Sequence, residues 1–384
     1  MTPIERASAL FEVSLNSLKQ FKAVDPFNLH VLEGCLVACD RFYGSMLITA
    51  IDEQPTEQVV IGTPKQRYPF DKKGRFLFPE TSHINIYEKL DGTNILAYSY
   101  ETNGELHVTY KTRLTPILQE SRWGNFYQLW NSLLTDEMEW SIKALVTKWR
   151  INLSFELYGK LNTHLIEYDV PLSYKLLFGI KNSVSNSQII EPINLPNKKW
   201  AESISCLQPI LTLTKNSNLP EEYNRLRLEQ EEKNHKVEGE HTIEGSEGFV
   251  WYLTDRYNVT RQYKCKPPSV EEIHWAGGLS KNTVLATVMN AYENSMNPEY
   301  EDVKRLLLEE FKEGVIELQH SMIMDCLSIV RKKLELEEHI MYEYNAIENV
   351  SSLSSPDVMR KLSPKFKREE MKKVYTILKI RGLV

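Results

Sequence analysis

The sequence contains no apolar run near the roughly 18 residues that a membrane-spanning helix needs, and residues 1–6 lack the apolar core of a signal peptide. Its five cysteines are odd in number and scattered, and no two pairs have zinc-ligand spacing. Cys35 and Cys39, four residues apart, fit a packed core better than a metal site. We therefore expect a soluble, cytoplasmic protein without structural metal.

An excess of basic residues is also lacking. The chain has 46 Lys and Arg against 52 Asp and Glu, which gives a net charge of −6. This balance excludes a protein that coats nucleic acid uniformly, but it permits a local basic groove. A length of 384 residues with 42% hydrophobic residues predicts two or three packed domains.

The most informative stretch is Tyr87-Glu88-Lys89-Leu90-Asp91-Gly92-Thr93-Asn94. A lysine becomes a nucleophile when nearby cations or desolvation lower its pKa. Apolar residues before it, and the run 95–100 after it, predict two strands, so Lys89 lies in a loop at a strand end. Asp91 is expected to hold this loop and Gly92 to let the backbone approach a phosphate. Taken alone, the motif also fits a surface turn.

Other charged residues follow predicted strands. Lys111 and Arg113 follow the strand 106–110 and bring two cations to the same sheet edge, although Lys111 also fits a solvated strand end. Glu156 interrupts the apolar strand 154–159, so it needs a lysine, a metal or a sugar hydroxyl as partner.

A second hairpin carries further charges. Glu247 begins the predicted strand 247–253, and 259–265 is its hairpin partner. Alternation places Lys264 and Lys266 on one face, where they repel unless an anion lies between them. This pattern is typical of a phosphate site.

The remaining segments are less specific. A helical stripe runs from Ile4 to Phe21, and 45–51 with 58–61 predicts a hairpin, with nothing catalytic in either. Residues 65–78 mix lysine and arginine with aromatics, which fits either nucleic-acid contact or a packed linker. Phe178, in the strand 174–180, fits either base stacking or the core. The helical insertion 116–148 and its flank carry tryptophans expected in the core: Trp123, Trp130, Trp140 and Trp149.

After residue 283 the pattern becomes helical. Two helices are predicted at 284–296 and 299–311, and a long amphipathic helix at 315–334. Ser355-Pro356 and Ser363-Pro364 look like helix starts. The basic end, 365–381, fits either a clamp for RNA phosphates or a solvated face. The long helix fits either a homodimer contact or packing within its own domain.

In this order, the motifs resemble the covalent nucleotidyltransferase superfamily of polynucleotide ligases and RNA capping enzymes. The matching segments lie within about 76–270: Lys89-Leu90-Asp91-Gly92, Lys111-Thr112-Arg113, Phe155-Glu156-Leu157-Tyr158-Gly159, Tyr174 to Gly179, Glu247-Gly248-Phe249-Val250 and Lys264-Cys265-Lys266. DNA ligases and capping enzymes usually carry a basic residue where this chain has Asn94, which is similar to RNA ligases. The long N-terminal segment before Lys89 and the helical C-terminal region most resemble the homodimeric archaeal-type RNA ligases.

The resemblance implies an α+β fold: an antiparallel-sheet nucleotidyltransferase core, ATP-grasp-like, with an N-terminal α/β segment and an all-helical C-terminal domain. The expected domains are 1–75, 76–282 and 283–384.

The resemblance also implies roles for residues. Lys89 would form a lysyl-AMP from ATP, and Lys264 and Lys266 would stabilise the α-phosphate. Glu247 would act through the waters of Mg²⁺ (or Mn²⁺). The remaining nucleotide contacts would come from Glu88 and Phe178 on adenine, Arg113 and Glu156 on ribose, and the motif residues Asp91, Gly92 and Asn94.

The implied activity is an ATP-dependent RNA ligase acting on RNA with 5′-phosphate and 3′-OH ends, without a membrane partner. Two alternatives remain. One is a DNA ligase or a GMP-transferring capping enzyme of the same superfamily. The other is a non-catalytic sensor of ATP and RNA ends, against which stands the presence of every motif lysine and carboxylate.

Overall fold

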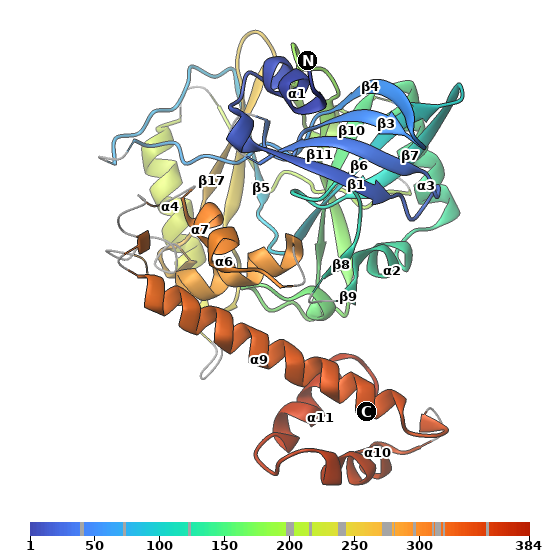
Figure 1. Cartoon of the computed structure of the whole chain (residues 1–384). Coiled ribbons are helices and arrows are strands. Elements are labelled where there is room, and N and C mark those ends of the chain that lie inside the picture. Colours follow the sequence, from blue (N-terminus) through green and yellow to red (C-terminus); the bar gives the residue numbers. More distant parts are fainter. Residues whose placement is uncertain are drawn as a thin grey trace.

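The computed structural model describes residues 1–38, 42–71, 74–121, 124–196, 203–214, 217–236, 243–270, 279, 281–294, 297–308, 311, 316–317, 319–350 and 353–384. Three larger antiparallel sheets and a helical C-terminal region make up the described chain (Figure 1). The predicted mixture of helices and antiparallel sheets is confirmed. Within this part of the chain, no helix has both the length and the apolar character needed to cross a membrane. Cys39 and Trp123 lie outside the described residues.

The N-terminal segment is one helix followed by a four-stranded sheet. Helix α1 (Pro3–Phe11) starts with a capping box, in which Thr2 and Glu5 satisfy each other's backbone N–H groups. The predicted helix up to Phe21 is wrong beyond Phe11, because Glu12 adopts a left-handed conformation (φ 54°) that ends the helix. The sheet follows as β1 (Leu18–Val24), β2 (Val31–Val37), β3 (Met46–Ile51) and β4 (Gln54–Val60). The predicted β3–β4 hairpin is confirmed.

Two central sheets face each other across the middle of the molecule. The five-stranded sheet has the order β12 (Ile189–Ile190), β11 (Ser173–Lys181), β10 (Ile151–Tyr158), β6 (Thr93–Thr102), β7 (Glu105–Lys111). The four-stranded sheet has the order β13 (Leu211–Leu213), β5 (His83–Glu88), β16 (Phe249–Thr254), β17 (Thr260–Cys265). Because β5 belongs to one sheet and β6 to the other, Lys89–Gly92 is the crossover between them.

The N-terminal sheet shares its hydrophobic core with these sheets. Leu36, Leu47 and Ile48 pack in one cluster with Tyr98 and Phe178, all of them at most 2% exposed. The core therefore crosses the boundary expected near residue 75, which stays a prediction.

Short helices and strands cover the central sheets. They are β8 (Glu120–Ser121), β9 (Gly124–Asn125), α2 (Phe126–Asn131), α3 (Asp136–Lys143), a π-helical segment (Ala144–Lys148), α4 (Leu219–Glu231), β14 (His235–Lys236) and β15 (Ile243–Glu244). Of the tryptophans expected in the core, Trp130 is fully buried, whereas Trp140 and Trp149 are 63% and 46% exposed. The prediction is therefore wrong for the last two.

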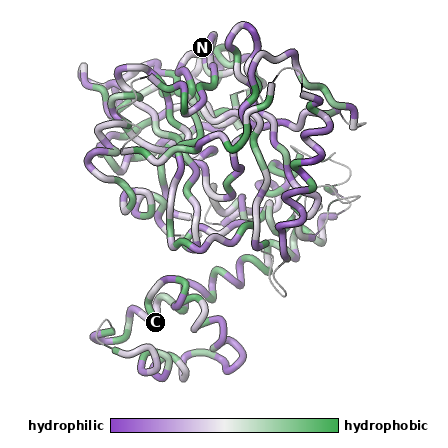
Figure 2. Tube along the Cα trace, turned by 180° about the vertical axis from the view of Figure 1, so that it is seen from behind, coloured by the Kyte–Doolittle hydropathy of each residue, from purple (hydrophilic) through white to green (hydrophobic). Residues whose placement is uncertain are grey.

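The C-terminal helices form two packed groups joined by one long helix. They are α6 (Lys281–Asn294), α7 (Tyr300–Leu307), α9 (His320–Asn345), α10 (Ser355–Leu362) and α11 (Met371–Ile380). The first half of α9 packs with α6 and α7, and its second half with α10 and α11. The second group stands apart from the body of the molecule (Figure 2). A short 3₁₀ helix (Ser363–Lys365) begins at the helix start expected at Ser363-Pro364, and α11 begins only at Met371.

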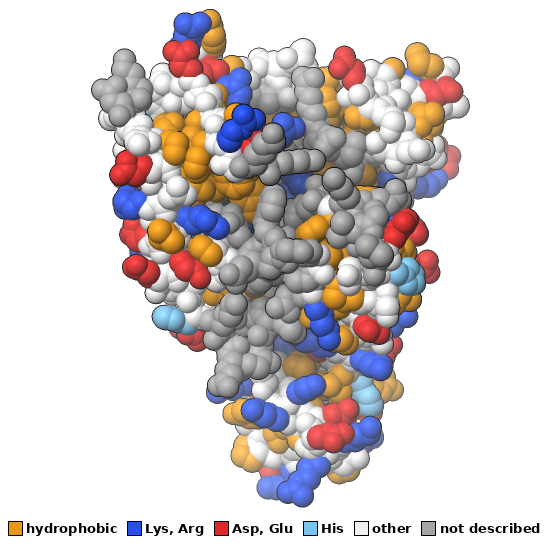
Figure 3. Space-filling model, turned by 90° about the vertical axis from the view of Figure 1, so that its left-hand side faces the viewer, with side chains coloured by type: hydrophobic (Ala, Val, Ile, Leu, Met, Phe, Trp, Pro, Cys, Tyr) orange, Lys and Arg blue, Asp and Glu red, His pale blue; other side chains and the backbone are white. Residues whose placement is uncertain are grey.

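Basic side chains lie on the surface of the second C-terminal group, formed by the end of α9 with α10 and α11 (Figure 3). Lys365, Lys367, Arg368, Lys372 and Lys373 are all exposed. Their role towards RNA stays a prediction.

Candidate active site

Lys89 enters the space between the two central sheets directly after β5. Its backbone N–H donates to the carbonyl of Gly248 (2.9 Å), and its Nζ donates to Oε2 of Glu247 (2.5 Å). Gly248 has φ 122°, and a Cβ there would overlap the carbonyl oxygen of Cys265. Only glycine fits this position, so the sequence Glu247-Gly248 places the carboxylate against Lys89.

Glu247 lies between two lysines. Its Oε1 is 2.7 Å from Nζ of Lys266, and both residues are at least 93% buried. Burial alone would raise the pKa of Glu247, but Lys266 and Lys89 together lower it to about 2. Burial would lower the pKa of Lys266, but Glu247 raises it well above its usual value. The carboxylate is therefore ionised at neutral pH and holds Lys266 charged.

These side chains line a cavity of about 280 Å³. Of the predicted site residues, nine line it: Lys89, Asp91, Gly92, Asn94, Arg113, Glu156, Glu247, Lys264 and Lys266. Segments far apart in the sequence thus meet at one place, as the resemblance implies.

Asp91 fixes the loop beside the cavity. Its Oδ2 accepts hydrogen bonds from the backbone N–H groups of Leu165 (2.5 Å) and Ile166 (2.7 Å), and its own N–H donates to the hydroxyl of Tyr168 (2.8 Å). Burial, and secondarily the nearby Glu247, raise the pKa of Asp91 to about 6. Asp91 makes the loop-holding contacts expected from the sequence.

Gly92 and Asn94 make contacts that hold the strands around the site in place. A Cβ on Gly92 would overlap the carbonyl oxygen of Leu157, so glycine is needed here for close approach to β10. Gly92 also lines the cavity, so its expected approach to a phosphate stays a prediction. Asn94 donates to Ser154 Oγ (2.9 Å) and accepts from Thr63 Oγ1 (2.7 Å), which ties the N-terminal segment to β10.

Lys111 is neither a solvated strand end nor a cation facing the cavity. It is fully buried, and its Nζ donates to three backbone carbonyls: Gly44 (3.0 Å), Thr112 (2.8 Å) and Arg113 (3.0 Å). Three acceptors match the three N–H donors of an ammonium group. Burial, with a smaller effect of the Arg113 charge, lowers the pKa of Lys111 to about 7.

Arg113 and Glu156 are the remaining charged groups at the cavity. The Arg113 guanidinium lies 5.8 Å from the ring centroid of Tyr43, within the range of a cation–π contact. Burial raises the pKa of Glu156 to about 7, although the charges of Lys89 and Arg113 oppose this shift. A ligand hydroxyl or cation at this place would complete the surroundings of Glu156.

Two predicted residues lie elsewhere. The side chain of Glu88, at the end of β5, is exposed and does not line the cavity. Phe178 is 1% exposed, and its ring packs edge-on against Tyr252 with 6.4 Å between centroids. Phe178 is therefore a core residue, which is the alternative that its strand pattern had left open.

The structure also adds residues that sequence reasoning missed. The N-terminal segment contributes Tyr43, Lys65 and Gln66 to the cavity. Lys65 belongs to the basic and aromatic stretch 65–78, whose composition was a sequence signal for contact with a nucleic acid. Another residue of that stretch, Tyr68, lies with its ring centroid 4.3 Å from Nζ of Lys264. The remaining lining residues are Leu114 and His164 from the central part of the chain, and Thr287, Asn290, Leu306, Leu307 and Phe311 from the C-terminal part.

The described residues contain no group of three or more His, Cys, Asp or Glu side chains that could hold a metal ion. Both oxygens of Glu247 already meet lysines. Oxygens of phosphates or water would complete the coordination of a divalent ion at this cavity.

No protein-family model matches the sequence, and comparison with curated proteins finds no match. Among solved structures, the chain is similar to an archaeal ATP-dependent RNA ligase, form 2, at 11% identity over 99% of both chains, with a TM-score of 0.46. Form 1 is similar at 12% identity over 95% of this chain and 90% of that chain (TM-score 0.45). A protein from Aquifex aeolicus named as an ATP-dependent DNA ligase is similar at 13% identity over 89% of this chain and 81% of that chain (TM-score 0.43). These similarities concern the course of the chain and do not by themselves assign an activity.

Proposed function

We propose that the chain is an ATP-dependent RNA ligase, which joins RNA 3′-OH and 5′-phosphate ends through a lysyl-AMP on Lys89 and an adenylylated RNA 5′ end. The observation that carries this proposal is the Lys89–Glu247–Lys266 arrangement, with a partly buried Lys89, two buried partners and distances of 2.5 Å and 2.7 Å, at the crossover between two sheets. It is supported by the order of the sequence motifs, nine residues of which line one cavity.

In the first step, Nζ of Lys89 attacks the α-phosphorus of ATP. Only the neutral amine has a lone pair, so the ammonium group of Lys89 first loses one proton to solvent. The new N–P bond then replaces the bond from phosphorus to the bridging oxygen, pyrophosphate leaves, and a second proton passes from Nζ to solvent. Because Lys266 and Lys89 lower the pKa of Glu247 to about 2, Glu247 is a poor proton acceptor at neutral pH. Its role is to orient the lysine amine through the 2.5 Å hydrogen bond.

The phosphates of ATP would meet the cations of the cavity. Lys264 and Lys266 lie on the same face of the β17 end, and Lys65 and Arg113 approach from the N-terminal segment and from the end of β7. Fixed positive charges of this kind stabilise the negative charge that develops on the transferred phosphate.

The position of Glu156 supports the proposed contact with ribose, whereas the proposed contacts with the adenine base have no such structural support. Glu156 lines the cavity beside Arg113, and its raised pKa fits a carboxyl group that meets ribose hydroxyls. Glu88 and Phe178 lie outside the cavity, so their proposed contacts with adenine depend on the family resemblance alone.

Magnesium or manganese would enter bound to the triphosphate, where it supplies charge neutralisation for the leaving pyrophosphate. The residues fit a hydrated ion, because each oxygen of Glu247 has a second lone pair that could accept a hydrogen bond from a metal-bound water beside its contact with a lysine. In the transfer of AMP to Lys89, the nucleophile, its orientation and the remaining charge stabilisation would come from the side chains named above.

In the later steps, AMP passes from Lys89 to an RNA 5′-phosphate, and a 3′-hydroxyl then displaces AMP. RNA rather than DNA is favoured by Asn94 in place of a basic residue and by the helical C-terminal region. A homodimer through α9 remains part of the proposal, since Met324 and Ile329 leave 46% and 44% of their surface exposed on that helix.

The test is gel autoradiography of the purified protein after incubation with magnesium and α-labelled ATP or, separately, α-labelled GTP. We expect label from ATP that is absent in Lys89→Ala. Label from GTP alone would favour a capping enzyme instead. No label in protein shown to be free of bound AMP would contradict the enzyme and favour a non-catalytic sensor. Labelled protein is then offered nicked RNA and nicked DNA duplexes, and we expect sealing of RNA ends.

A further inference from the structure

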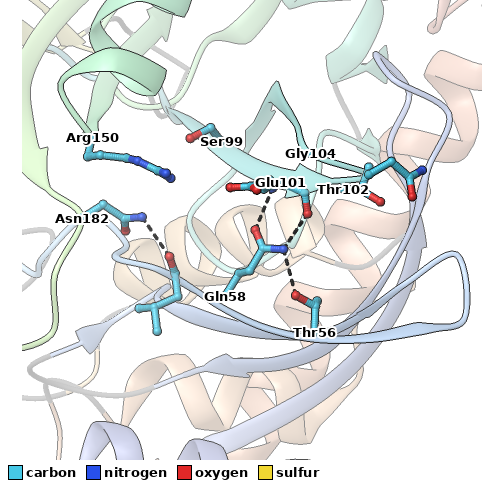
Figure 4. Close-up of a pocket in the computed structure, with 10 residues that line it drawn as sticks. Thr56, Gln58, Ser99, Glu101, Thr102, Gly104, Arg150 and Asn182 are labelled. Atoms are coloured by element: carbon cyan, nitrogen blue, oxygen red, sulfur yellow. Dashed lines mark hydrogen bonds between the residues drawn. The ribbon is translucent and has the colours of Figure 1, made fainter.

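A second cavity, of about 400 Å³, lies at the other end of β6. Its walls are strand β4, the end of β6 with the Asn103-Gly104 turn, and the turn before β10 (Figure 4). Asn94 and Glu101 are seven positions apart on β6, so the two cavities are about 20–25 Å apart along this strand. The second cavity is therefore distinct from the proposed active site.

The polar walls of this cavity are held in place by hydrogen bonds. Gln58 donates to the carbonyl of Glu101 (2.7 Å), accepts from the Glu101 N–H (2.7 Å), and donates to Thr56 Oγ1 (3.0 Å). Asn182 donates to the carbonyl of Val59 (2.9 Å) and accepts from the N–H of Ile61 (2.8 Å). The site is thus formed before any ligand binds, which lowers the entropic cost of binding.

Arg150 supplies a positive charge to this frame. Its side chain extends towards Ser99 and Glu101 (Figure 4), and its carbonyl accepts a hydrogen bond from the N–H of Asn182 (3.1 Å). Arg150 adopts φ 54°, which is uncommon for a residue with a side chain. Among the described residues no ion pair with Arg150 is formed.

The neighbours of Arg150 in the chain fit contact with a nucleic-acid strand. Trp149 is 46% exposed, although a tryptophan usually buries most of its ring. Lys148 and, across the β10–β11 pair, Lys181 are also exposed. Exposed aromatic rings beside basic groups are the pattern that binds single strands, by stacking on bases and pairing with phosphates.

Glu101 also lines the cavity and would repel a bare anion. A nucleotide suits the two opposite charges of Arg150 and Glu101 better than a bare anion does. It offers a phosphate to the Arg150 guanidinium and an exocyclic amino group to the Glu101 carboxylate. Carboxylates accept hydrogen bonds from base amino groups of this kind, such as N4 of cytosine. A volume of about 400 Å³ falls within the range of small-ligand sites.

We propose that this cavity holds one nucleotide of single-stranded RNA, with its phosphate on Arg150 and its base edge on Glu101. This inference rests on the proposed function, because it gives the RNA ligase a contact with its substrate strand far from Lys89. RNA long enough to reach both cavities would bind more tightly than a short end.

The test is fluorescence anisotropy with the full chain and a 5′-phosphorylated single-stranded RNA of about 20 nucleotides, beyond the ~4–16 nucleotides that one compact binding site covers. Arg150→Gln removes the charge and keeps the stem, and Arg150→Lys restores the charge. Arg261→Gln is the matched control, since Arg261 is also exposed and lines neither cavity.

We expect Arg150→Gln to weaken binding about tenfold, the loss of one charge-assisted contact, and to reduce the slope of log affinity against log salt by about 0.7. Arg150→Lys should recover part of both, and Glu101→Ala should weaken binding. ATP-dependent labelling of Lys89 should stay unchanged in all of them. Affinity and salt slope equal to those of Arg261→Gln would overturn the inference, and so would tighter binding by Glu101→Ala.

The outcomes separate this inference from the proposed function. An effect of Arg150→Gln in a protein that takes no label from ATP supports the RNA cavity and contradicts the ligase. Label from ATP with equal RNA binding by the Arg150 and Arg261 variants contradicts the cavity alone. Label from ATP without any RNA binding by the unaltered chain contradicts both the cavity and the RNA substrate.

Discussion

The ammonium group of Lys111 donates a hydrogen bond to the carbonyl of Gly44, 3.0 Å away, and so ties the N-terminal segment to the end of β7. Its other two hydrogen bonds fix the carbonyls of Thr112 and Arg113. Tyr43 and Arg113, which flank these contacts in the chain, both line the proposed active site. The N-terminal segment is therefore part of the site, and Lys111 sets its position.

Lys111→Met should lower the free energy of unfolding by about 2–4 kcal/mol. Two buried carbonyls and one partly buried carbonyl would lose this donor, and each unsatisfied buried polar group costs about 1–3 kcal/mol, partly relieved when the loop relaxes. Urea unfolding followed by tryptophan fluorescence measures the change. Lys22→Met is the control, because Lys22 is exposed and forms a surface ion pair with Glu33 (2.8 Å), so its loss should change stability by less than about 1 kcal/mol. Equal effects of the two substitutions would show that the Lys111 contacts do not stabilise the fold.

Glu247→Gln should slow the labelling of Lys89 by ATP about a hundredfold. The substitution removes the charge that orients Lys89 and leaves two lysines facing each other without a carboxylate between them. Single-turnover labelling over time measures the rate. Glu244→Gln, an exposed residue three positions earlier, is the matched control. An unchanged rate in Glu247→Gln would contradict the orienting role.

The same variant has a distinct pH dependence. The pKa of Glu247 is lowered from 4.5 to about 2 in the folded chain, so its stabilising effect is complete above pH 4.5 and is lost as the pH falls towards 2. The shift corresponds to about 3 kcal/mol. We expect Glu247→Gln to lack this acid-sensitive part when unfolding free energies are compared between pH 5 and pH 2.5. Parallel curves for the two proteins would argue against the buried ion pairs.

For Glu156 the pH dependence of stability should run in the opposite direction, with the loss of stability at high pH, and Glu156→Gln should remove that loss. Burial raises the pKa of Glu156 from 4.5 to about 7, so the folded chain binds its proton more tightly than the unfolded chain does. Stability is then complete below pH 4.5 and falls as the pH rises through 7, by about 3 kcal/mol. At pH 8 the Gln variant should be more stable than the unaltered chain and less active with ATP. A variant that is less stable at pH 8 would contradict this interpretation of Glu156.

Much of the fold and the site could be predicted because the signals are local. Alternation along β17 places Lys264 and Lys266 together, and the apolar runs around Lys89 predict β5 and β6. The helix expected up to Phe21 is wrong because the spacing of three between Leu15, Leu18 and Phe21 is typical of a helix, whereas Leu15 lies in a 3₁₀ helix and the other two lie in β1. Local spacing could not decide between these two structures.

The rest depends on contacts between distant segments. Lys111 has the sequence context of a solvated strand end, and only the fold brings Gly44 to its ammonium group. Lys65 and Asn290 line one cavity although they are far apart in the chain. No spacing rule links such pairs, so sequence reasoning placed the motifs but not the walls that the N- and C-terminal segments add.

Lys65→Ala should raise the ATP concentration needed for half-maximal labelling about tenfold, the loss of one charge-assisted contact to a phosphate. Lys65 lines the cavity that also holds Lys89 and Lys264. Lys65→Arg should keep most of the affinity, because it keeps the charge. Lys19→Ala removes an exposed charge from β1 and serves as the control. Labelling as efficient as in the Lys19 variant would exclude Lys65 from ATP binding.

The exposed pair Lys372 and Lys373 on α11 tests whether the basic end of the chain contacts RNA. Replacing both by alanine should weaken binding of single-stranded RNA and reduce the slope of log affinity against log salt by about 1.4, or about 0.7 for each phosphate that the protein no longer neutralises. Lys332 and Lys333 on α9 are a matched pair, since they are also adjacent and exposed and their replacement changes the net charge equally. Because the net charge changes by the same amount in both double variants, a larger effect of the α11 pair would reflect position rather than overall charge. Equal effects of both pairs would mean that α11 is a solvated face, and that the strand is held by the body of the protein instead.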